Sequence, residues 1–258
     1  MLEVLGRIWR LAATGLCFVV FGCGGLLVRC VVFPLLLLLV RDQRRREDVT
    51  KSLIHHAFRW FVALMRGVGV LTYEVRHGER LQRRGLLVLA NHPSLIDVVF
   101  LIALIRHADC IVKASLADNP FTRGPVRAAG FITNNGGAEL LQDCLASLQQ
   151  GNNLIIFPEG TRTPMCGSVR LQRGAANVAV RGNIDITPVH IHCSHPLLTK
   201  GAAWWQVPSQ RPHFVIDVRE DIAITPFVAQ TSSESLAARH VTDYLAEYLF
   251  KEPSCAST

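Results

Sequence analysis

Hydrophobic residues form one long run near the start of the chain and later recur in short blocks. Residues 11–28 carry no charge, Arg29 interrupts the run, and it then continues to residue 40. The first stretch is just long enough to cross a bilayer, whereas 11–40 is too long for one upright helix. Basic residues flank both ends, which favours a segment that enters the membrane and returns, with the glycines of 22–25 and Pro34 as places to bend. A single span is the alternative.

The following segment, 50–70, places apolar residues at helical spacing with basic residues between them. Two interpretations fit this pattern. The helix either lies at a membrane surface or packs its apolar face on the rest of the protein.

From residue 71 the pattern changes to strand-length apolar blocks that alternate with helical ones. This alternation predicts an α/β fold with a mixed, mostly parallel sheet flanked by helices, preceded by an N-terminal membrane-associated helical segment. We therefore divide the chain into membrane-anchoring helices (1–70) and an α/β domain (71–258). The expected strands are 86–90, 110–113, 153–157, 186–192 and 213–218, and the expected helices are 94–106, 138–150, 174–181 and 233–250.

The composition favours a membrane partner over nucleic acid. Half of the 258 residues are hydrophobic and the net charge is +7. A basic surface suits nucleic acid or an anionic membrane, but no nucleic-acid-binding motif is present. The eight cysteines show no Cys-x-x-Cys spacing, so we expect reduced thiols in a cytoplasmic compartment.

Two polar blocks follow two of the expected strands. Asn91-His92-Pro-Ser94-Leu-Ile-Asp97 follows 86–90, and Phe-Pro-Glu-Gly-Thr-Arg at 157–162 follows the apolar run of the strand at 153–157. Carboxyl ends of strands in open α/β sheets line one crevice, so both blocks are expected to face it. His92 suits a general base, and Asp97 can orient its imidazole. Ser94 and Asp97 also fit a capping box with Ser94 as N-cap.

The His-x4-Asp block and the second block, in this order and at this separation, resemble the lysophosphatidic acid acyltransferase family of membrane glycerolipid acyltransferases. The resemblance extends over 86–191. It implies an O-acyltransferase that moves a fatty acyl group from acyl-CoA or acyl-ACP to a hydroxyl of a lyso-lipid such as 1-acylglycerol-3-phosphate. No cofactor is expected beyond this co-substrate. Membrane lipids and the CoA or acyl carrier protein thioester are the expected partners, at the cytoplasmic face of a membrane, the inner or plasma membrane if the source is bacterial.

The resemblance also implies roles for the second block, with Glu159, Gly160, Thr161 and Arg162 as acceptor-binding residues. Gly160 allows close backbone approach, and the Arg162 guanidinium can bind a phosphate or carboxylate through two hydrogen bonds. A Glu–Arg surface pair in a tight turn is the alternative.

Two basic residues outside these blocks are candidates for supporting the oxyanion or another anion. Lys113 ends an expected strand and is either such a group or a solvated lysine. The family arginine expected after Gly130 is absent, since no arginine occurs in 131–137. Arg127 lies upstream and is the candidate replacement. A phosphate-free lyso-lipid acceptor, amino-acid-derived or other, is therefore an alternative, as is a catalytically idle lipid-binding protein.

The histidines near the end of the 186–192 strand do not change this interpretation. His190, His192, Cys193 and His195 have partial metal-ligand spacing. No second cluster accompanies them elsewhere in the sequence, so no metal is expected.

Overall fold

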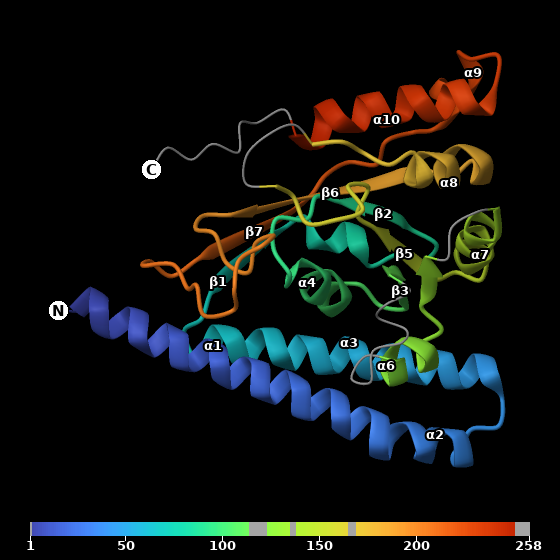
Figure 1. The fold of residues 1–258 in the computed structure, drawn as a ribbon. Helices are drawn as coiled ribbons and strands as arrows, with labels where there is room; N and C mark the ends of the chain where they lie inside the picture. Colours follow the sequence, from blue (N-terminus) through green and yellow to red (C-terminus); the bar gives the residue numbers. More distant parts are fainter. Residues whose placement is uncertain (1, 114–122, 135–137, 165–168, 251–258) are drawn as a thin grey trace.

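The computed structural model describes residues 2–113, 123–134, 138–164 and 169–250 (Figure 1). The strands are β1 Thr72–Arg76, β2 Leu87–Ala90, β3 Ala108–Lys113, β4 Ile132–Asn134, β5 Asn153–Ile156, β6 Ile186–Cys193 and β7 His213–Val218. The helices are α1 Leu2–Leu27, the π-helical η1 Val28–Val32, α2 Phe33–Leu39, α3 Gln43–Gly67, the 3-10 helix η2 Gly78–Leu81, α4 Asp97–Leu104, α6 Arg123–Ala128, α7 Ala138–Gln149, α8 Gly174–Gly182, α9 Thr225–Ala229 and α10 Glu234–Phe250.

One seven-stranded sheet organises the molecule, in the order β1-β7-β6-β2-β5-β3-β4. The strands from β6 to β4 are parallel neighbours, β7 is antiparallel to β6, and β1 is parallel to β7. The predicted fold class, α/β with a mixed and mostly parallel sheet, is confirmed.

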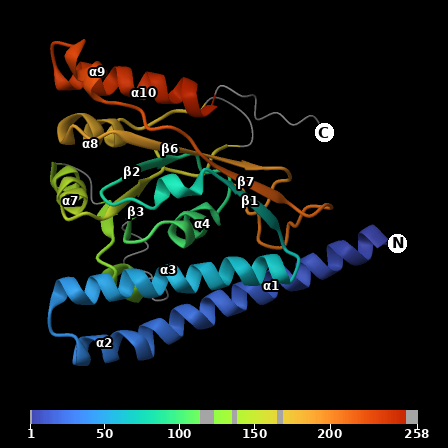
Figure 2. The same cartoon turned by 180° about the vertical axis from the view of Figure 1, so that it is seen from behind.

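Helices cover both faces of the sheet. Figure 2 shows α8 and α10 on one side, and α4, α3 and then α1 on the other. The central strand β2 is buried throughout. Its residues alternate between the faces, so that Leu87 and Leu89 join the core beneath α7, α8 and α10, while Val88 and Ala90 join the core beneath α3 and α4.

The N-terminal run is helical from end to end. Val4–Leu39 forms one 36-residue helical stretch that is long and apolar enough to cross a membrane. At 1.5 Å per residue it is about 54 Å long, well beyond the roughly 30 Å hydrocarbon core. The predicted reversal within 11–40 is wrong: the glycines of 22–25 stay inside α1, and the π-helical turn η1 accommodates Pro34 at the start of α2. The chain reverses only after Val40.

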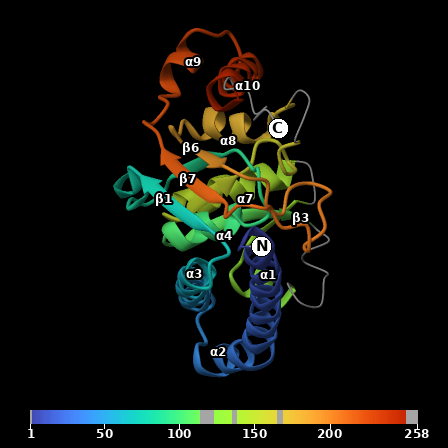
Figure 3. The same ribbon diagram turned by 90° about the vertical axis from the view of Figure 1, so that its left-hand side faces the viewer.

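Helix α3 runs back alongside α1 and contacts both α1 and α4 (Figure 3). The ring of Phe21 in α1 lies 5.5 Å from that of Phe61 in α3. Helix α3 also packs on α4. Its Phe61 and Met65 belong to the same hydrophobic core as Val88 and Ala90 of β2. The Lys51 ammonium of α3 lies 2.7 Å from the Asp109 carboxylate of β3, and both side chains are buried. The interpretation of 50–70 as a helix packed on the rest of the protein is therefore confirmed.

The five expected strands are present, and the structure adds two. β1 is a partly exposed edge strand, and β4 has three residues, so neither gives a strong apolar block. The helix expected at 94–106 is shorter, since α4 spans Asp97–Leu104. The short helices α6 and α9 have no clear apolar period and were not predicted.

Candidate active site

The two motif blocks meet because their strands are neighbours. β2 and β5 pair in parallel, with Leu87 opposite Leu154 and Leu89 opposite Ile156. His92 follows the end of β2 and Phe157 follows the end of β5, so both blocks leave the sheet at one edge. The prediction that they face a common site is confirmed.

His92 and Asp97 form the hydrogen-bonded pair expected from the sequence. Nδ1 of His92 lies 3.0 Å from Oδ2 of Asp97. The imidazole stacks on the Phe157 ring, with centroids 4.1 Å apart and planes inclined by 22°. Because the carboxylate accepts from Nδ1–H, the other ring nitrogen, Nε2, is left with a lone pair. The His92 side chain is 16% exposed, so a substrate can reach it.

Asp97 is completely buried. Burial raises the pKa of Asp97 to about 6, opposed by its hydrogen bond with His92 and by the charge of Arg162. Oδ2 also accepts from the Ser94 N–H at 2.6 Å, whereas Oδ1 has no hydrogen-bond partner among the described residues. This arrangement holds a fully buried carboxylate against a partly exposed imidazole.

Only half of the predicted capping box forms. The Asp97 carboxylate accepts from the Ser94 N–H, but the Ser94 hydroxyl donates to the carbonyl of Leu197 rather than accepting from the Asp97 N–H. Helix α4 begins at Asp97. Ser94 as N-cap is therefore wrong: Ile96 occupies the N-cap position without a side-chain cap, and the Ser94 hydroxyl accepts from the Ile96 N–H at 3.5 Å.

Glu159 connects the two blocks. Its Oε1 accepts from the His92 N–H at 2.8 Å and from the Thr163 hydroxyl at 2.8 Å. The side chain is buried, which raises the pKa of Glu159. Glu159 was predicted to bind the acceptor, and in the structure this carboxylate oxygen accepts from the backbone N–H of His92.

Thr163 is a site residue that the sequence reasoning missed. Its N–H donates to the His92 carbonyl at 2.7 Å, and its hydroxyl accepts from the His92 N–H at 3.1 Å. Both backbone groups of His92 are thereby fixed by one residue. Its position immediately after Arg162 was the available signal, since a hydroxyl next to a motif turn often bonds nearby backbone.

Arg162 fastens the second block to the connection between β6 and β7. Its Nη1 donates to the carbonyls of Leu198 and Thr199, each at 2.8 Å. The side chain is half-buried, and its described hydrogen bonds involve Nη1 alone. The remaining guanidinium nitrogens are therefore available for an anion. Nothing in the sequence indicated that Leu198 and Thr199 belong to the site.

Asn91 fixes the end of β2 to β6. Its side-chain amide donates to the Ile191 carbonyl at 2.8 Å and accepts from the Ile191 N–H at 2.7 Å. The side chain thus supplies both bonds that a strand residue would make, and the backbone is free to turn away at His92.

The remaining predicted residues are Gly160, Thr161, Lys113 and Arg127, which lie outside the hydrogen-bonded pair of His92 and Asp97. Gly160 has a positive φ of 65°, which favours glycine, and neighbours the half-buried Thr161 in the turn after β5. Lys113 ends β3, the neighbour of β5, at the same edge of the sheet. Arg127 is exposed on α6, which packs on α3, η1 and α2, and no hydrogen bond or ion pair between described residues joins it to His92 or Arg162.

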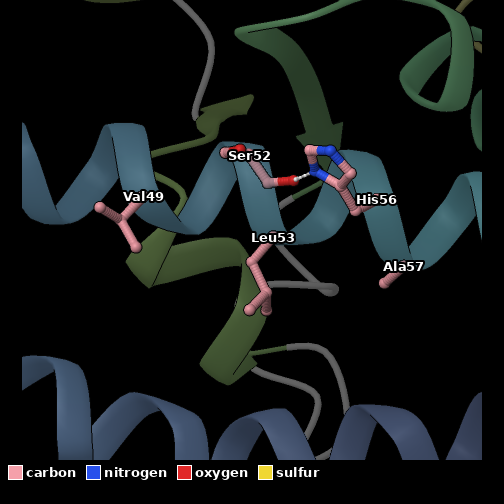
Figure 4. Close-up of a pocket in the computed structure, with 5 residues that line it drawn as sticks. All are labelled: Val49, Ser52, Leu53, His56 and Ala57. Atoms are coloured by element: carbon pink, nitrogen blue, oxygen red, sulfur yellow. Dashed lines mark hydrogen bonds between the residues drawn. The ribbon is translucent and has the colours of Figure 1, made fainter.

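The structure also describes a hollow beside α3 and the surroundings of Cys193. A hollow beside α3 is lined by Val49, Ser52, Leu53, His56 and Ala57 (Figure 4). There the His56 Nδ1–H donates to the Ser52 carbonyl at 2.7 Å. The Cys193 thiol donates to the His195 carbonyl, and the described residues contain no group of three or more potential metal ligands.

Residues 72–192 match the family model described as Acyltransferase. The 1-acyl-sn-glycerol-3-phosphate acyltransferase of Helicobacter pylori is 37% identical over 112 residues, which are 40% of this chain and 46% of that protein. The lyso-ornithine lipid O-acyltransferase of Pseudomonas aeruginosa is 34% identical over 128 residues, 48% of each chain. The 1-acyl-sn-glycerol-3-phosphate acyltransferase of Saccharomyces cerevisiae is 26% identical over 209 residues, 77% of this chain and 65% of that protein.

The matches to curated relatives are partial, whereas the structural match is nearly complete. This chain spans 36% to 65% of the length of the first curated relatives. This chain also matches the crystal structure of the 1-acyl-sn-glycerophosphate acyltransferase PlsC from Thermotoga maritima. The alignment covers 95% of this chain and 100% of the Thermotoga chain, with a TM-score of 0.68 and 21% identity, which shows the same fold. Over residues 72–192 the chain therefore resembles the acyltransferases, as the two motif blocks predicted.

Proposed function

We propose that the protein transfers a fatty acyl group from an acyl thioester to a hydroxyl of a lyso-lipid, with His92 as general base. The observation that carries this proposal is the 3.0 Å contact between His92 Nδ1 and the buried Asp97 carboxylate. That contact keeps the proton on Nδ1 and presents Nε2 as a base.

The reaction then needs no protein nucleophile. Nε2 of His92 takes the hydroxyl proton while the acceptor oxygen attacks the thioester carbonyl. Asp97 stabilises the imidazolium that forms. The tetrahedral intermediate collapses with cleavage of the carbon–sulfur bond, and the imidazolium returns the proton to the departing thiolate. The products are the acylated lipid and the free thiol of the carrier.

Acceptor binding is assigned to the turn after β5. The Arg162 nitrogens that make no hydrogen bond to a described residue suit a phosphate oxygen, as charge-assisted hydrogen bonds of this kind are strong. Glu159, Gly160 and Thr161 shape the same turn, and Lys113 at the end of β3 is assigned to support the oxyanion. The acceptor class is a lyso-lipid such as 1-acylglycerol-3-phosphate.

A phosphate-free acceptor is the second candidate. One relative with 34% identity over 128 residues is named a lyso-ornithine lipid O-acyltransferase. The family arginine after Gly130 is missing here, and Arg127 lies on α6 against the N-terminal helices. Arg162 binds a carboxylate as readily as a phosphate, so both observations favour a carboxylate-headed lyso-lipid as the alternative.

Membrane lipids are the proposed partners, through the apolar helix at Val4–Leu39. The donor is acyl-CoA or acyl-ACP, and the proposed location is the cytoplasmic face of a membrane. Both carriers deliver the same thioester, so the chemistry at His92 is identical for either.

An acceptor competition tests this proposal. Purified protein receives acyl-CoA or acyl-ACP with equimolar lysophosphatidic acid and lyso-ornithine lipid, and mass spectrometry identifies the acylated products. Preferential acylation of lysophosphatidic acid supports the first acceptor, and preferential acylation of lyso-ornithine lipid supports the second. Thioester consumption that is equally fast with and without acceptors would contradict acyl transfer to a lipid.

A further inference from the structure

All four tryptophans of the chain are exposed. Trp9, Trp60, Trp204 and Trp205 expose 61%, 60%, 43% and 58% of their surface. Tryptophan is highly buried on average in folded proteins, and its ring is enriched where membrane meets water because it has an apolar body and one polar N–H. Such consistent exposure indicates an apolar partner for the segments that carry these tryptophans.

Two of these tryptophans lie in the connection between β6 and β7, residues 194–212, which we call the tryptophan loop. The loop rests on α1: the Trp204 ring centroid is 5.9 Å from that of Phe18. A Cβ atom added at Gly15 would lie 3.5 Å from the Trp204 ring, which is ordinary van der Waals contact, so the ring lies close to the α1 backbone. Arg10 also donates to the carbonyl of Ser209. The loop and the N-terminal half of α1 therefore lie side by side (Figure 1).

The surface next to the loop is apolar along α1. Only 6% of its most apolar stretch is buried, and its uncovered side chains include Ile8, Leu16 and Val19. Two basic residues of these segments, Arg7 in α1 and Lys200 in the tryptophan loop, are also exposed. An apolar face with basic neighbours is complementary to a bilayer that contains anionic lipid.

The same loop holds the active site. Its carbonyls at Leu198 and Thr199 accept from Arg162. The N–H of Leu95, three residues after His92, donates to the Leu198 carbonyl at 3.1 Å, and Leu95 is itself 46% exposed. The tryptophan pair and the base are therefore connected through one short hydrogen-bonded segment.

We propose that the tryptophan loop is a second membrane contact, which inserts Trp204 and Trp205 into the lipid surface beside α1. This contact places the exposed Leu95, three residues after His92, against the bilayer, so that a lyso-lipid reaches His92 from the membrane. The insertion itself does not depend on the proposed function; only the route of the acceptor rests on it.

Fluorescence depth measurements test the insertion on the full chain. With Trp9→Phe and Trp60→Phe, the loop pair provides all tryptophan emission. The protein is reconstituted into vesicles of phosphatidylcholine and phosphatidylglycerol, with or without bromine on the acyl chains. We expect a blue shift relative to the detergent-free, lipid-free protein, and strong quenching by the brominated lipid.

A reporter on the opposite side of the sheet is the matched control. Tyr244 on α10 is 42% exposed and stacks with Tyr248, and α10 lies far from α1 (Figure 1). With Phe at all four tryptophan positions, Tyr244→Trp should show no bromine quenching. Equal quenching of both reporters, or no quenching of the loop pair in protein that sediments with vesicles, would overturn the proposal. A blue shift that follows protein concentration without lipid would instead assign the surface to a second copy of the chain, and also overturns it.

The acceptor route has its own readout. Trp205→Ser should raise the apparent KM for a vesicle-borne lyso-lipid by roughly 10-fold, as expected from losing part of one ring's burial. Its kcat and KM for a short-chain, water-soluble acceptor should not change. An unchanged KM for the vesicle-borne lipid would overturn the route. Absence of transfer in the wild-type protein would refute the proposed function, while the fluorescence result would remain valid.

Discussion

The site at the strand ends and the N-terminal helix α1 differ in the contacts that their side chains make. At the site, polar groups from distant segments bond one another: His92 to Glu159, 67 residues apart, and Asn91 to Ile191, 100 apart. Along α1, apolar side chains lie exposed and few polar contacts fix them. The geometry of the site therefore depends on individual hydrogen bonds, whereas the membrane association expected of α1 depends on its mean hydropathy. Substitutions at the site should change rates, and substitutions on α1 should change location.

The largest effect is expected at the base. His92→Ala should lower acyl transfer by roughly 10²–10⁴-fold, the range for removal of a positioned general base. Folding should be little affected, because the ring is partly exposed and stacks mainly on Phe157. The measurements are initial rates and thermal unfolding. His56→Ala, at an exposed histidine on α3, is the control. Near-wild-type transfer by purified His92→Ala would exclude the mechanism.

Asp97→Asn should reduce transfer by about 10²-fold or more, because an amide cannot hold the imidazole in the same tautomer or stabilise its charged form. The variant keeps an oxygen that can accept from the Ser94 N–H. Loss of rate without loss of folding is expected, measured by steady-state kinetics and circular dichroism. A rate within about twofold of wild type would remove Asp97 from the mechanism.

The same substitution should change how stability depends on pH. The pKa of Asp97 is raised from 3.8 to about 6 in the folded protein, so between these values the folded state binds more protons than the unfolded state. The free energy of unfolding that Asp97 contributes therefore falls as pH rises from about 4 to about 6, and the loss is complete above that range. Relative to wild type, Asp97→Asn should gain roughly 3 kcal/mol across this interval. Parallel pH profiles of urea unfolding would contradict this.

A charge on α1 should affect location rather than chemistry. Val19 is 61% exposed near the middle of the helix. Val19→Lys places a charge where a bilayer penalises it by about 2.5–3.5 kcal/mol, which corresponds to a loss of membrane partitioning of roughly 10²-fold. Vesicle co-sedimentation measures this, with Ala63→Lys on the exposed side of α3 as the control. Equal sedimentation of the two variants would show that α1 does not contact lipid.

The smallest effect is expected at Thr163. Thr163→Val removes the hydroxyl that bonds both His92 N–H and Glu159, while the Thr163 N–H bond to the His92 carbonyl remains. A shift in the position of the base should lower kcat by roughly 10-fold, since small misplacements at a reacting centre are costly. Thr163→Ser should restore most of the rate. If Val and Ser variants lose the same activity, packing rather than the hydroxyl is the cause.

The sequence predicted the parts of the site that lie within contiguous blocks. His92 and Asp97 are only five residues apart in the sequence. The two blocks follow strands with clear apolar runs, so the proximity of the two blocks could be inferred. The partners supplied by the loop, Leu198 and Thr199, contribute only backbone carbonyls, and any residue type carries a carbonyl. No side-chain pattern could have identified them.

The fold shows the same division between strong and weak local signals. β2 and β5 were predicted because they are buried on both faces and, apart from Asn153 at the start of β5, apolar. β1 and β4 were missed because an edge strand and a three-residue strand need few apolar side chains. The course of 11–40 was predicted wrongly because glycines permit a bend without requiring one, and helix packing against α3 keeps α1 extended.

The long separation between bonded residues also sets an order of events during synthesis. The apolar helix at Val4–Leu39 is made about 160 residues before the Thr199 carbonyl, which accepts the hydrogen bond of Arg162. At about 5–20 residues per second, roughly 10–30 s pass between these two stages. A nascent chain would thus expose its membrane-seeking helix well before it can consume thioester. Ribosome-bound chains arrested before residue 199 should therefore associate with vesicles yet remain inactive.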